Sequence, residues 1–213
     1  MTANIRYVLT AIDDIMLHAW NKHCGNLPNV SIVKASIDTV NCQALVAPTN
    51  SWCVMDGGAD VAIARACGGA AFLDRVRKET STPMPVGCAQ AIQACTNSRG
   101  VQYAILAPTM VVPEKLPHDT VNPYLATIAA IKQSDRLKLH SVAFVGMGTG
   151  VGKIPHELAA WQWRNAWIDH HDGQTRPMSA FDTLIWRQRL ITIRQTHERQ
   201  LLDLLCEQGR HHV

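Results

Sequence analysis

Short apolar runs alternate with longer amphipathic stretches along most of this chain. The short runs are bounded by Gly, Pro, Asn or Asp, which is typical of buried β-strands, whereas in the longer stretches the apolar residues recur at helical spacing. Strands are therefore expected at residues 5–11, 30–37, 44–48, 89–96, 103–108 and from residue 141 onward.

Helices are expected between these strands. Asp13-Asp14 precedes one helical pattern, and Asn122-Pro123 can begin another because proline fits the first helical turn. The alternation of strands and helices predicts a three-layer α/β/α sandwich with a mixed, largely parallel central sheet. The expected helices cover residues 14–25, 57–78 with a break at Gly68-Gly69, the stretch from 122, and 155–169.

A polar turn at residues 170–174 suggests a boundary in the chain. We expect one α/β domain over residues 1–173 and a C-terminal helical extension over residues 174–213. Within the extension, residues 179–207 have apolar positions at helical spacing. Two roles are open for this helix, packing on the domain or self-association into a homo-oligomer.

Two glycine-rich loops follow expected strands. After the apolar run 44–48, a polar loop leads to Gly57-Gly58, which opens a helix; after the run from Ser141, glycines alternate from Gly146 to Gly152 ahead of another helix. The free backbone N–H groups and positive dipole at a helix N-terminus favour phosphate. Because both loops follow strands of one sheet, we expect them to face a common crevice. The alternative is that these glycines only turn the chain.

The second loop does not fit two common phosphate-binding motifs. A Walker loop would need Gly where Met147 stands and Ser or Thr where Ile154 stands. The strict alternation of glycines between Gly146 and Gly152 never gives the Gly-x-Gly-x-x-Gly spacing of a dinucleotide fingerprint. The sequence therefore favours neither a P-loop NTPase nor a Rossmann dehydrogenase.

Composition further narrows the possible functions of the chain. The net charge is only +3 and no run of Lys and Arg concentrates it, so nothing indicates nucleic-acid binding. No apolar stretch is as long as about eighteen residues, and the N-terminal sequence has no signal-peptide pattern. We therefore expect a cytoplasmic protein without a membrane-spanning helix. The seven cysteines are scattered without a Cys-x-x-Cys pair, so we expect reduced thiols, no metal and no cofactor.

Taken together, the motifs resemble the macrodomain family, whose members bind ADP-ribose. The first loop of that family commonly reads Val-Asn-Ala-Ala-Asn-Ser, then a Gly-rich run, Val-Asp and a helix; the second reads Ser-Thr-Gly-Val/Ile followed by Tyr/Phe-Gly-x-Pro. This chain is most similar to a divergent branch of the family, over roughly residues 30 to 169. The matching segments are Ala47 to Ser51, Met55 to Gly58, Ala107 to Met110 and Gly148 to Gly152.

The resemblance implies binding of ADP-ribose, free or attached to a protein. The first loop would hold one phosphate and the second the other, because a Cβ at Gly57 or Gly58 would obstruct a close backbone approach. Asn50 would bind ribose hydroxyls, with stabilisation of its own loop as the alternative. The implied ligand-binding residues are Ile37, Asp38, Asn50, Asp56, Gly57, Gly58, Ala59, Gly148, Thr149, Gly150, Val151 and Gly152.

Whether the chain is an enzyme is left open. By resemblance Asp60, with Asn50, would serve an ADP-ribosyl hydrolase or an ADP-ribose-phosphate phosphatase, Asp60 orienting the attacking water as a general base. The alternative for Asp60 is helix capping. Cys53 is a weaker candidate nucleophile, since no histidine is evidently placed to activate it.

Three positions depart from the family pattern. Ser36 stands where many macrodomains carry the aspartate that holds adenine, which leaves Asp38 as the nearby carboxylate. Ala47 replaces the first Asn of the common first loop, and Gly152 replaces the usual aromatic residue of the second. These departures motivate an alternative function, a non-enzymatic assembly or signalling protein whose pocket has drifted.

Overall fold

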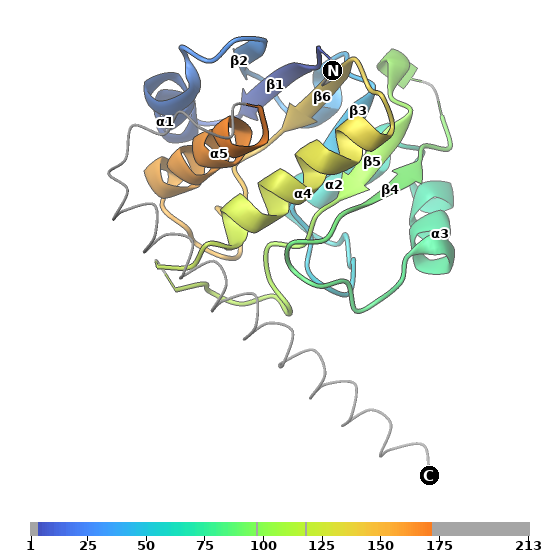
Figure 1. Cartoon of the computed structure of the whole chain (residues 1–213). Helices are drawn as coiled ribbons and strands as arrows, with labels where there is room; N and C mark the ends of the chain where they lie inside the picture. Colours follow the sequence, from blue (N-terminus) through green and yellow to red (C-terminus); the bar gives the residue numbers. More distant parts are fainter. Residues whose placement is uncertain (1–3, 97, 118, 172–213) are drawn as a thin grey trace.

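A computed structural model describes residues 4–96, 98–117 and 119–171 of the chain, and these residues form a six-stranded sheet between two layers of helices (Figure 1). The strand order is β2-β1-β6-β3-β5-β4. All neighbours are parallel except β4 and β5, which are antiparallel, so the sheet is mixed as predicted. The strands are β1 Arg6–Ala11, β2 Val30–Lys34, β3 Ala44–Ala47, β4 Gln90–Gln93, β5 Tyr103–Leu106 and β6 Ser141–Phe144.

Alternate side chains along the strands serve opposite faces of the sheet. Tyr7 and Leu9 of β1 pack in the cluster that includes α1, α4 and α5, whereas Val8 packs in the cluster that includes α2 and α3. This division confirms the three-layer α/β/α sandwich. The helices are α1 Asp14–Cys24, α2 Gly58–Ala66, α3 Ala70–Glu79, α4 Asn122–Arg136 and α5 His156–His171.

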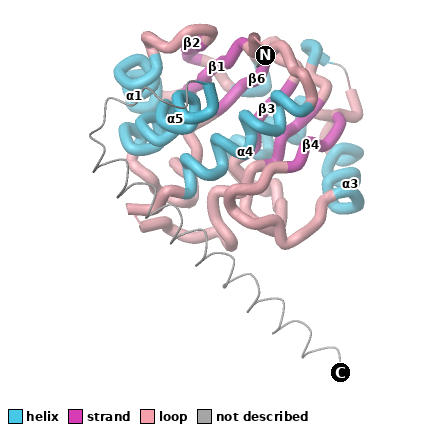
Figure 2. Tube along the Cα trace, viewed as in Figure 1, coloured by secondary structure: helices cyan, strands magenta, loops and turns pink. Residues whose placement is uncertain are grey.

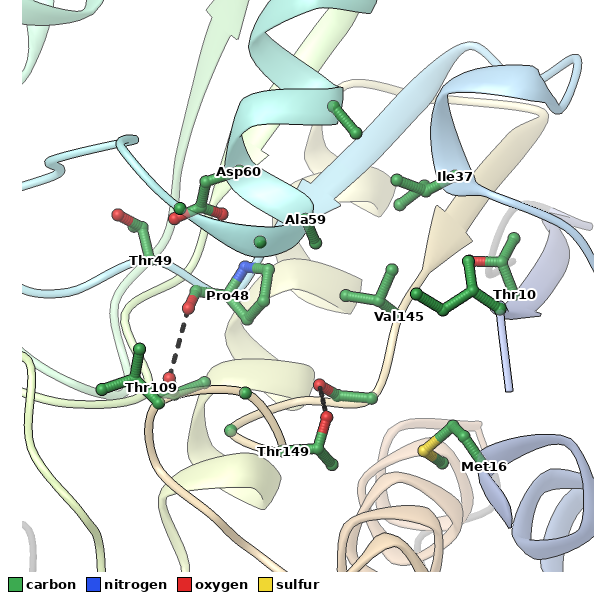
Figure 3. A pocket seen from close by; sticks show the side chains of 18 of the residues that line it. Thr10, Met16, Ile37, Pro48, Thr49, Ala59, Asp60, Thr109, Val145 and Thr149 are labelled. Atoms are coloured by element: carbon green, nitrogen blue, oxygen red, sulfur yellow. Dashed lines mark hydrogen bonds between the residues drawn. The ribbon is translucent and has the colours of Figure 1, made fainter. Parts of the chain in front are cut away.

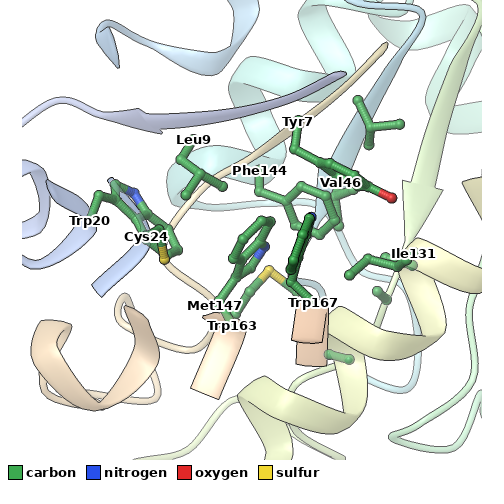
Figure 4. Close-up of a cluster of buried hydrophobic side chains, with 14 of the residues drawn as sticks. Tyr7, Leu9, Trp20, Cys24, Val46, Ile131, Phe144, Met147, Trp163 and Trp167 are labelled. Atoms are coloured by element: carbon green, nitrogen blue, oxygen red, sulfur yellow. The ribbon is translucent and has the colours of Figure 1, made fainter. Parts of the chain in front are cut away.

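Aromatic rings form the centre of the larger cluster (Figure 4). Trp163 of α5 is fully buried and meets Tyr7, Trp20 and Phe144 edge to face, with ring centroids 6.0, 5.9 and 5.5 Å away. Edge-to-face contacts of this kind add to the stability that burial alone provides. They fix α5 against β1, β6 and α1, and thereby fix the loop that leads from β6 into α5.

Capping side chains, glycines and a tight turn determine where several helices and strands begin and end. The Asp13 side chain accepts a 2.8 Å hydrogen bond from the Met16 N–H and caps α1. Gly68 and Gly69 have positive φ and separate α2 from α3, as predicted. The strand expected at 30–37 was too long, because Ile37–Thr39 form a 3₁₀ turn in which Thr39 donates to the Ser36 carbonyl.

A turn was expected to begin at residue 170, but the chain is still helical there. His170 and His171 belong to the last turn of α5: His170 hydrogen-bonds to Asp135, and His171 stacks on Trp167 with ring centroids 4.3 Å apart. The expected helix at 179–207 and the division at residue 173 concern residues outside the described part. Among the described residues, no helix is long and apolar enough to cross a membrane.

Candidate functional site

The two glycine loops leave the sheet from neighbouring parallel strands. Ala44 of β3 pairs with Val142 of β6, and Leu45 pairs with Ala143, so both strands end at the same edge. Figure 2 shows the long loops gathered there, at the end toward which the parallel arrows of Figure 1 point. Both loops line one cavity of about 530 Å³, shown in Figure 3. The carboxyl edge of a parallel sheet is where α/β proteins commonly bind ligands.

The first loop presents the N-terminus of α2 to the cavity. Asp56, Gly57, Gly58, Ala59 and Asp60 all line it. Gly58 has a φ of +54°, which favours glycine, and a Cβ on Gly57 or Gly58 would meet no atom within 4 Å. The backbone is therefore open to the cavity here, and an added Cβ would meet only a bound molecule.

The second loop contributes Gly148, Thr149, Gly150 and Val151 to the lining. Gly148 has a φ of +75°, and the Thr149 hydroxyl donates a 3.0 Å hydrogen bond to the Gly146 carbonyl, which holds the turn in shape. Successive N–H groups in such a turn can bind an anion.

Gly152 lies outside the lining of the cavity. It is buried, its carbonyl accepts a 2.9 Å hydrogen bond from the Leu116 N–H, and a Cβ would lie 2.6 Å from the Gly148 carbonyl oxygen. Close backbone packing therefore explains the glycine at this position.

Asn50 lines the cavity, yet its amide folds its own loop. Its Oδ1 accepts from the backbone N–H groups of Trp52 at 3.0 Å and Val54 at 3.4 Å, and its Nδ2 donates to the Val54 carbonyl at 3.4 Å. The structure thus shows the loop-stabilising role. One Nδ2–H is left over for a ligand.

Asp60 carries the most perturbed carboxylate of the cavity. Burial raises the pKa of Asp60 to about 7; the nearby Thr49 hydroxyl partly opposes the rise, and the Asp56 charge adds to it. Its Oδ1 is buried without a hydrogen-bond partner among the described residues, so this oxygen does not cap α2.

Cys53 is buried, and its pKa is raised to about 12 by burial and by the Asp60 charge, which disfavours a thiolate nucleophile.

Residues 36–38, which the resemblance places near the adenine, have two different roles. Ser36 and Ile37 line the cavity, whereas Asp38 lies outside the lining. Asp38 accepts a hydrogen bond from the Ser36 hydroxyl and lies 3.9 Å from the Arg65 guanidinium. Its carboxylate is therefore engaged in holding Ser36.

Sequence reasoning missed the part of the cavity formed by β1 and the start of α1. Strand β1 lies beside β6, so its carboxyl end meets the same edge as β3 and β6. The only signal was the polar and charged sequence at the end of an apolar run. The additional lining residues include Thr10, Ile12, Asp13 and Met16, with Thr49, Pro113 and His156 from other segments.

In the part of the chain that the structure describes, no group of three or more His, Cys, Asp or Glu is arranged to hold a metal ion. The polar side chains that line the cavity carry hydroxyls, carboxylates, the Asn50 amide and the His156 imidazole.

Comparison with known proteins places this architecture in a family. The model of the Macro domain matches residues 46–162. A protein from Aquifex aeolicus is 36% identical over 132 residues, which cover 62% of this chain and 76% of that protein. A protein from Aeropyrum pernix is 34% identical over 126 residues, covering 59% of this chain and 63% of that protein, so the chain spans less than two thirds of this relative.

Solved structures agree at the level of the fold. The Oceanobacillus iheyensis macrodomain with MES bound has a TM-score of 0.55 and 17% identity, covering 76% of this chain and 90% of that one. The Trypanosoma brucei macrodomain in complex with ADP has a TM-score of 0.54 and 17% identity, covering 81% and 70%. At such identities the likeness extends to the fold alone.

Gly152 and Gly150 make a matched test of the second loop. Gly152→Ala should lower the free energy of unfolding by roughly 1–3 kcal/mol, because its Cβ would meet backbone at 2.6 Å. Gly150→Ala should change it by less than about 0.5 kcal/mol, because nothing lies within 4 Å. Urea unfolding measures both variants. Equal losses would contradict the assignment of Gly152 to packing.

Asp60→Asn should change how stability depends on pH. The native carboxyl, with its raised pKa, binds more protons than the unfolded one between pH 3.8 and about 7, so wild-type stability falls as pH rises through this window. The neutral amide should remove this slope and raise the free energy of unfolding above pH 7 by roughly 1–3 kcal/mol. The gain is smaller than the full pKa shift implies, because the protein around the buried carboxylate relaxes. Urea unfolding at pH 5 and 8 measures the difference. Asp74→Asn on the exposed face of α3 should keep the wild-type slope, and an unchanged slope in Asp60→Asn would refute the prediction.

Proposed function

The chain belongs to the Macro domain family, and on that premise we propose that its cavity binds ADP-ribose or a close derivative. The observation that carries the proposal is the meeting of two glycine loops, from neighbouring parallel strands, in one cavity of about 530 Å³. Cavities of this size suit a dinucleotide-like ligand. Macrodomains of Oceanobacillus iheyensis and Trypanosoma brucei have been solved with ADP, which shares the pyrophosphate.

Each loop would bind one phosphate. The N–H groups of Gly58 and Ala59, at the positive end of α2, would hold one, and the turn from Gly148 to Val151 would hold the other. The adenine would then lie toward Ile12 and Ile37, and the distal ribose toward Asn50 and Asp60. In this arrangement the base is held by apolar walls, because Asp38 is engaged with Ser36.

Binding can be tested by thermal unfolding. ADP-ribose at a hundred times its dissociation constant should add about 2.7 kcal/mol and raise the Tm by roughly 5–10 °C. Gly57→Val should keep a folded protein with an unliganded Tm close to that of the wild type, since a Cβ there meets no protein atom within 4 Å, but should lose the ligand shift because the valine would occupy the phosphate position. Ala70→Val on the exposed start of α3 should keep the shift. No shift in the wild type at millimolar ADP-ribose would overturn the proposed function.

The rim of the cavity favours a protein-linked ligand. Among the described residues, the exposed large apolar side chains all line the cavity or adjoin lining residues in sequence. Ile12, Val54 and Val151 belong to the lining itself, so an apolar surface of a protein attached to the ligand would find contacts there. The six residues are Ile12, Ile15, Val54, Val61, Val112 and Val151.

We further propose that the chain hydrolyses the bond between ADP-ribose and its carrier, with Asp60 as general base. Its carboxyl is desolvated, lies beside the proposed phosphate site, and has a pKa of about 7, matched to accepting a proton from water near neutral pH. Water would attack the anomeric carbon of the distal ribose, and the carrier would leave with the proton that Asp60 has taken.

Turnover of an ADP-ribosylated protein tests this role. Asp60→Asn should lower the rate by about 10²-fold or more, since general-base catalysis contributes of this order, while ADP-ribose binding is retained. Equal rates in the two proteins, or no turnover by the wild type, would remove hydrolysis and leave a binding protein.

The alternative is a non-enzymatic assembly or signalling protein with a drifted pocket. Ala47, Ser36 and Gly152 support it, as departures from the common motifs. The proposed homo-oligomer through residues 174–213 belongs to this alternative and concerns residues outside the described part. The thermal-shift measurement separates the two, because a drifted pocket would bind no ADP-ribose.

A further inference from the structure

Two cysteines lie close together where α2 ends beside the edge of the sheet. Cys67 is the C-cap residue of α2, and Cys95 follows β4, which is an edge strand. The Cys95 N–H donates a 2.7 Å hydrogen bond to the Cys67 carbonyl, although α3 and β4 lie between them in the chain. Neither residue lines the cavity of the glycine loops.

This hydrogen bond limits the distance between the two Cα atoms. Standard bond lengths from each Cα to its hydrogen-bonded atom keep the two Cα atoms less than about 7 Å apart. Disulfides join cysteines whose Cα atoms are about 4.4–6.8 Å apart. The Cys95 Cβ also faces the end of α2, since a Cβ on Gly68 would lie 2.8 Å from it. The two residues are therefore close enough for a disulfide.

Neighbouring hydrogen bonds hold both residues in place. The Cys67 N–H donates to the Ile63 carbonyl at 3.0 Å in the last turn of α2, and the Ala94 N–H donates to the Gln102 carbonyl at 2.8 Å just before Cys95. With the two backbones held in this way, a disulfide requires mainly a rotation of the side chains between staggered rotamers.

The two thiols differ in their access to solvent. Cys95 is exposed and lines a surface cavity of about 390 Å³, whereas Cys67 is fully buried. Burial raises the pKa of Cys67 to about 12, and the nearby Cys95 thiol adds to the rise, so Cys67 is a poor first nucleophile. An accessible cysteine beside a second cysteine that can resolve its oxidised form is typical of oxidation-sensitive sites.

Other buried cysteines have different neighbours. The Cys24 Sγ lies 3.7 Å from the Ala160 carbonyl oxygen, and the Cys42 Sγ lies 4.0 Å from the Arg6 guanidinium. These thiols pack against groups that cannot be oxidised with them.

We propose that Cys67 and Cys95 are a site of reversible oxidation, at which hydrogen peroxide converts the two thiols into a disulfide within the native fold. The Cys95 sulfur attacks one peroxide oxygen; the O–O bond breaks, and a sulfenic acid and one water form. The Cys67 sulfur then attacks the Cys95 sulfur; the S–S bond forms, the S–O bond breaks, and the hydroxyl leaves as water with the Cys67 proton. The peroxide gains two electrons, which a small dithiol can return to the protein. The site does not depend on the proposed function.

Oxidation of the full chain tests the site. Reduced protein treated with equimolar hydrogen peroxide should lose the mass of two hydrogen atoms, and the tryptic fragments that hold Cys67 and Cys95 should stay joined until dithiothreitol is added. Cys95→Ser changes an exposed residue, so the variant should fold, and it should abolish the link. Cys88→Ser is the matched control and should keep the link, because Cys88 is also exposed and lies in the same tryptic fragment as Cys95.

Thermal unfolding shows whether the bond fits the native fold. The oxidised wild type should have a Tm roughly 5–10 °C above that of the reduced protein, because the bond restrains the unfolded chain, and Cys95→Ser should show no such rise. An unchanged or lower Tm would overturn the proposal. So would a disulfide through Cys88, a dimer linked through Cys95, or oxidation of Cys95 beyond the sulfenic acid while Cys67 remains a thiol.

Discussion

The pairing of β3 with β6 determines where every other feature of the cavity lies. These strands are far apart in sequence, and only two residue pairs define their register. Because the strands are parallel and adjacent, the polar loop after Pro48 and the glycine loop after Val145 emerge side by side. The helix that follows each loop then points its N-terminus toward the same edge of the sheet. Had another strand separated them, the two loops would emerge about 4.8 Å farther apart.

Burial on both faces of the sheet stabilises this pairing. The β3 side chains alternate between the two clusters, with Val46 in one and Leu45 in the other, and all are fully buried. A one-residue slip would exchange these faces and place each side chain against the wrong helices. The register of β3 is therefore fixed by the helices on both sides, and the loop geometry follows from it.

The sequence predicted the order of elements, the layers and the approach of the two loops. Local signals decided these features: glycine pairs, the Asn122-Pro123 helix start and runs of buried apolar residues. The place of β1 beside β6 could not be predicted, because it depends on a pairing between distant segments, and so Thr10 and Ile12 were missed.

The roles of single residues in the loops were harder to predict than the loops themselves. A glycine that admits a ligand and one that packs against backbone look alike in sequence, yet Gly150 is open and Gly152 is packed. The Asn50 amide could serve a ligand or its own loop, and only the geometry of Trp52 and Val54 decides. Thr49 gave no signal, because only the structure brings its buried hydroxyl close to the Asp60 carboxylate.

The segment after β5 ties the two loops together. The Ser51 N–H donates to the Met110 carbonyl at 2.9 Å, and the Leu116 N–H donates to the Gly152 carbonyl at 2.9 Å, so one stretch of chain is bonded to both walls of the cavity. These two bonds restrain how far the loops can move apart. To the extent that the loops are held close together in advance, the cost of ordering the protein on association is smaller.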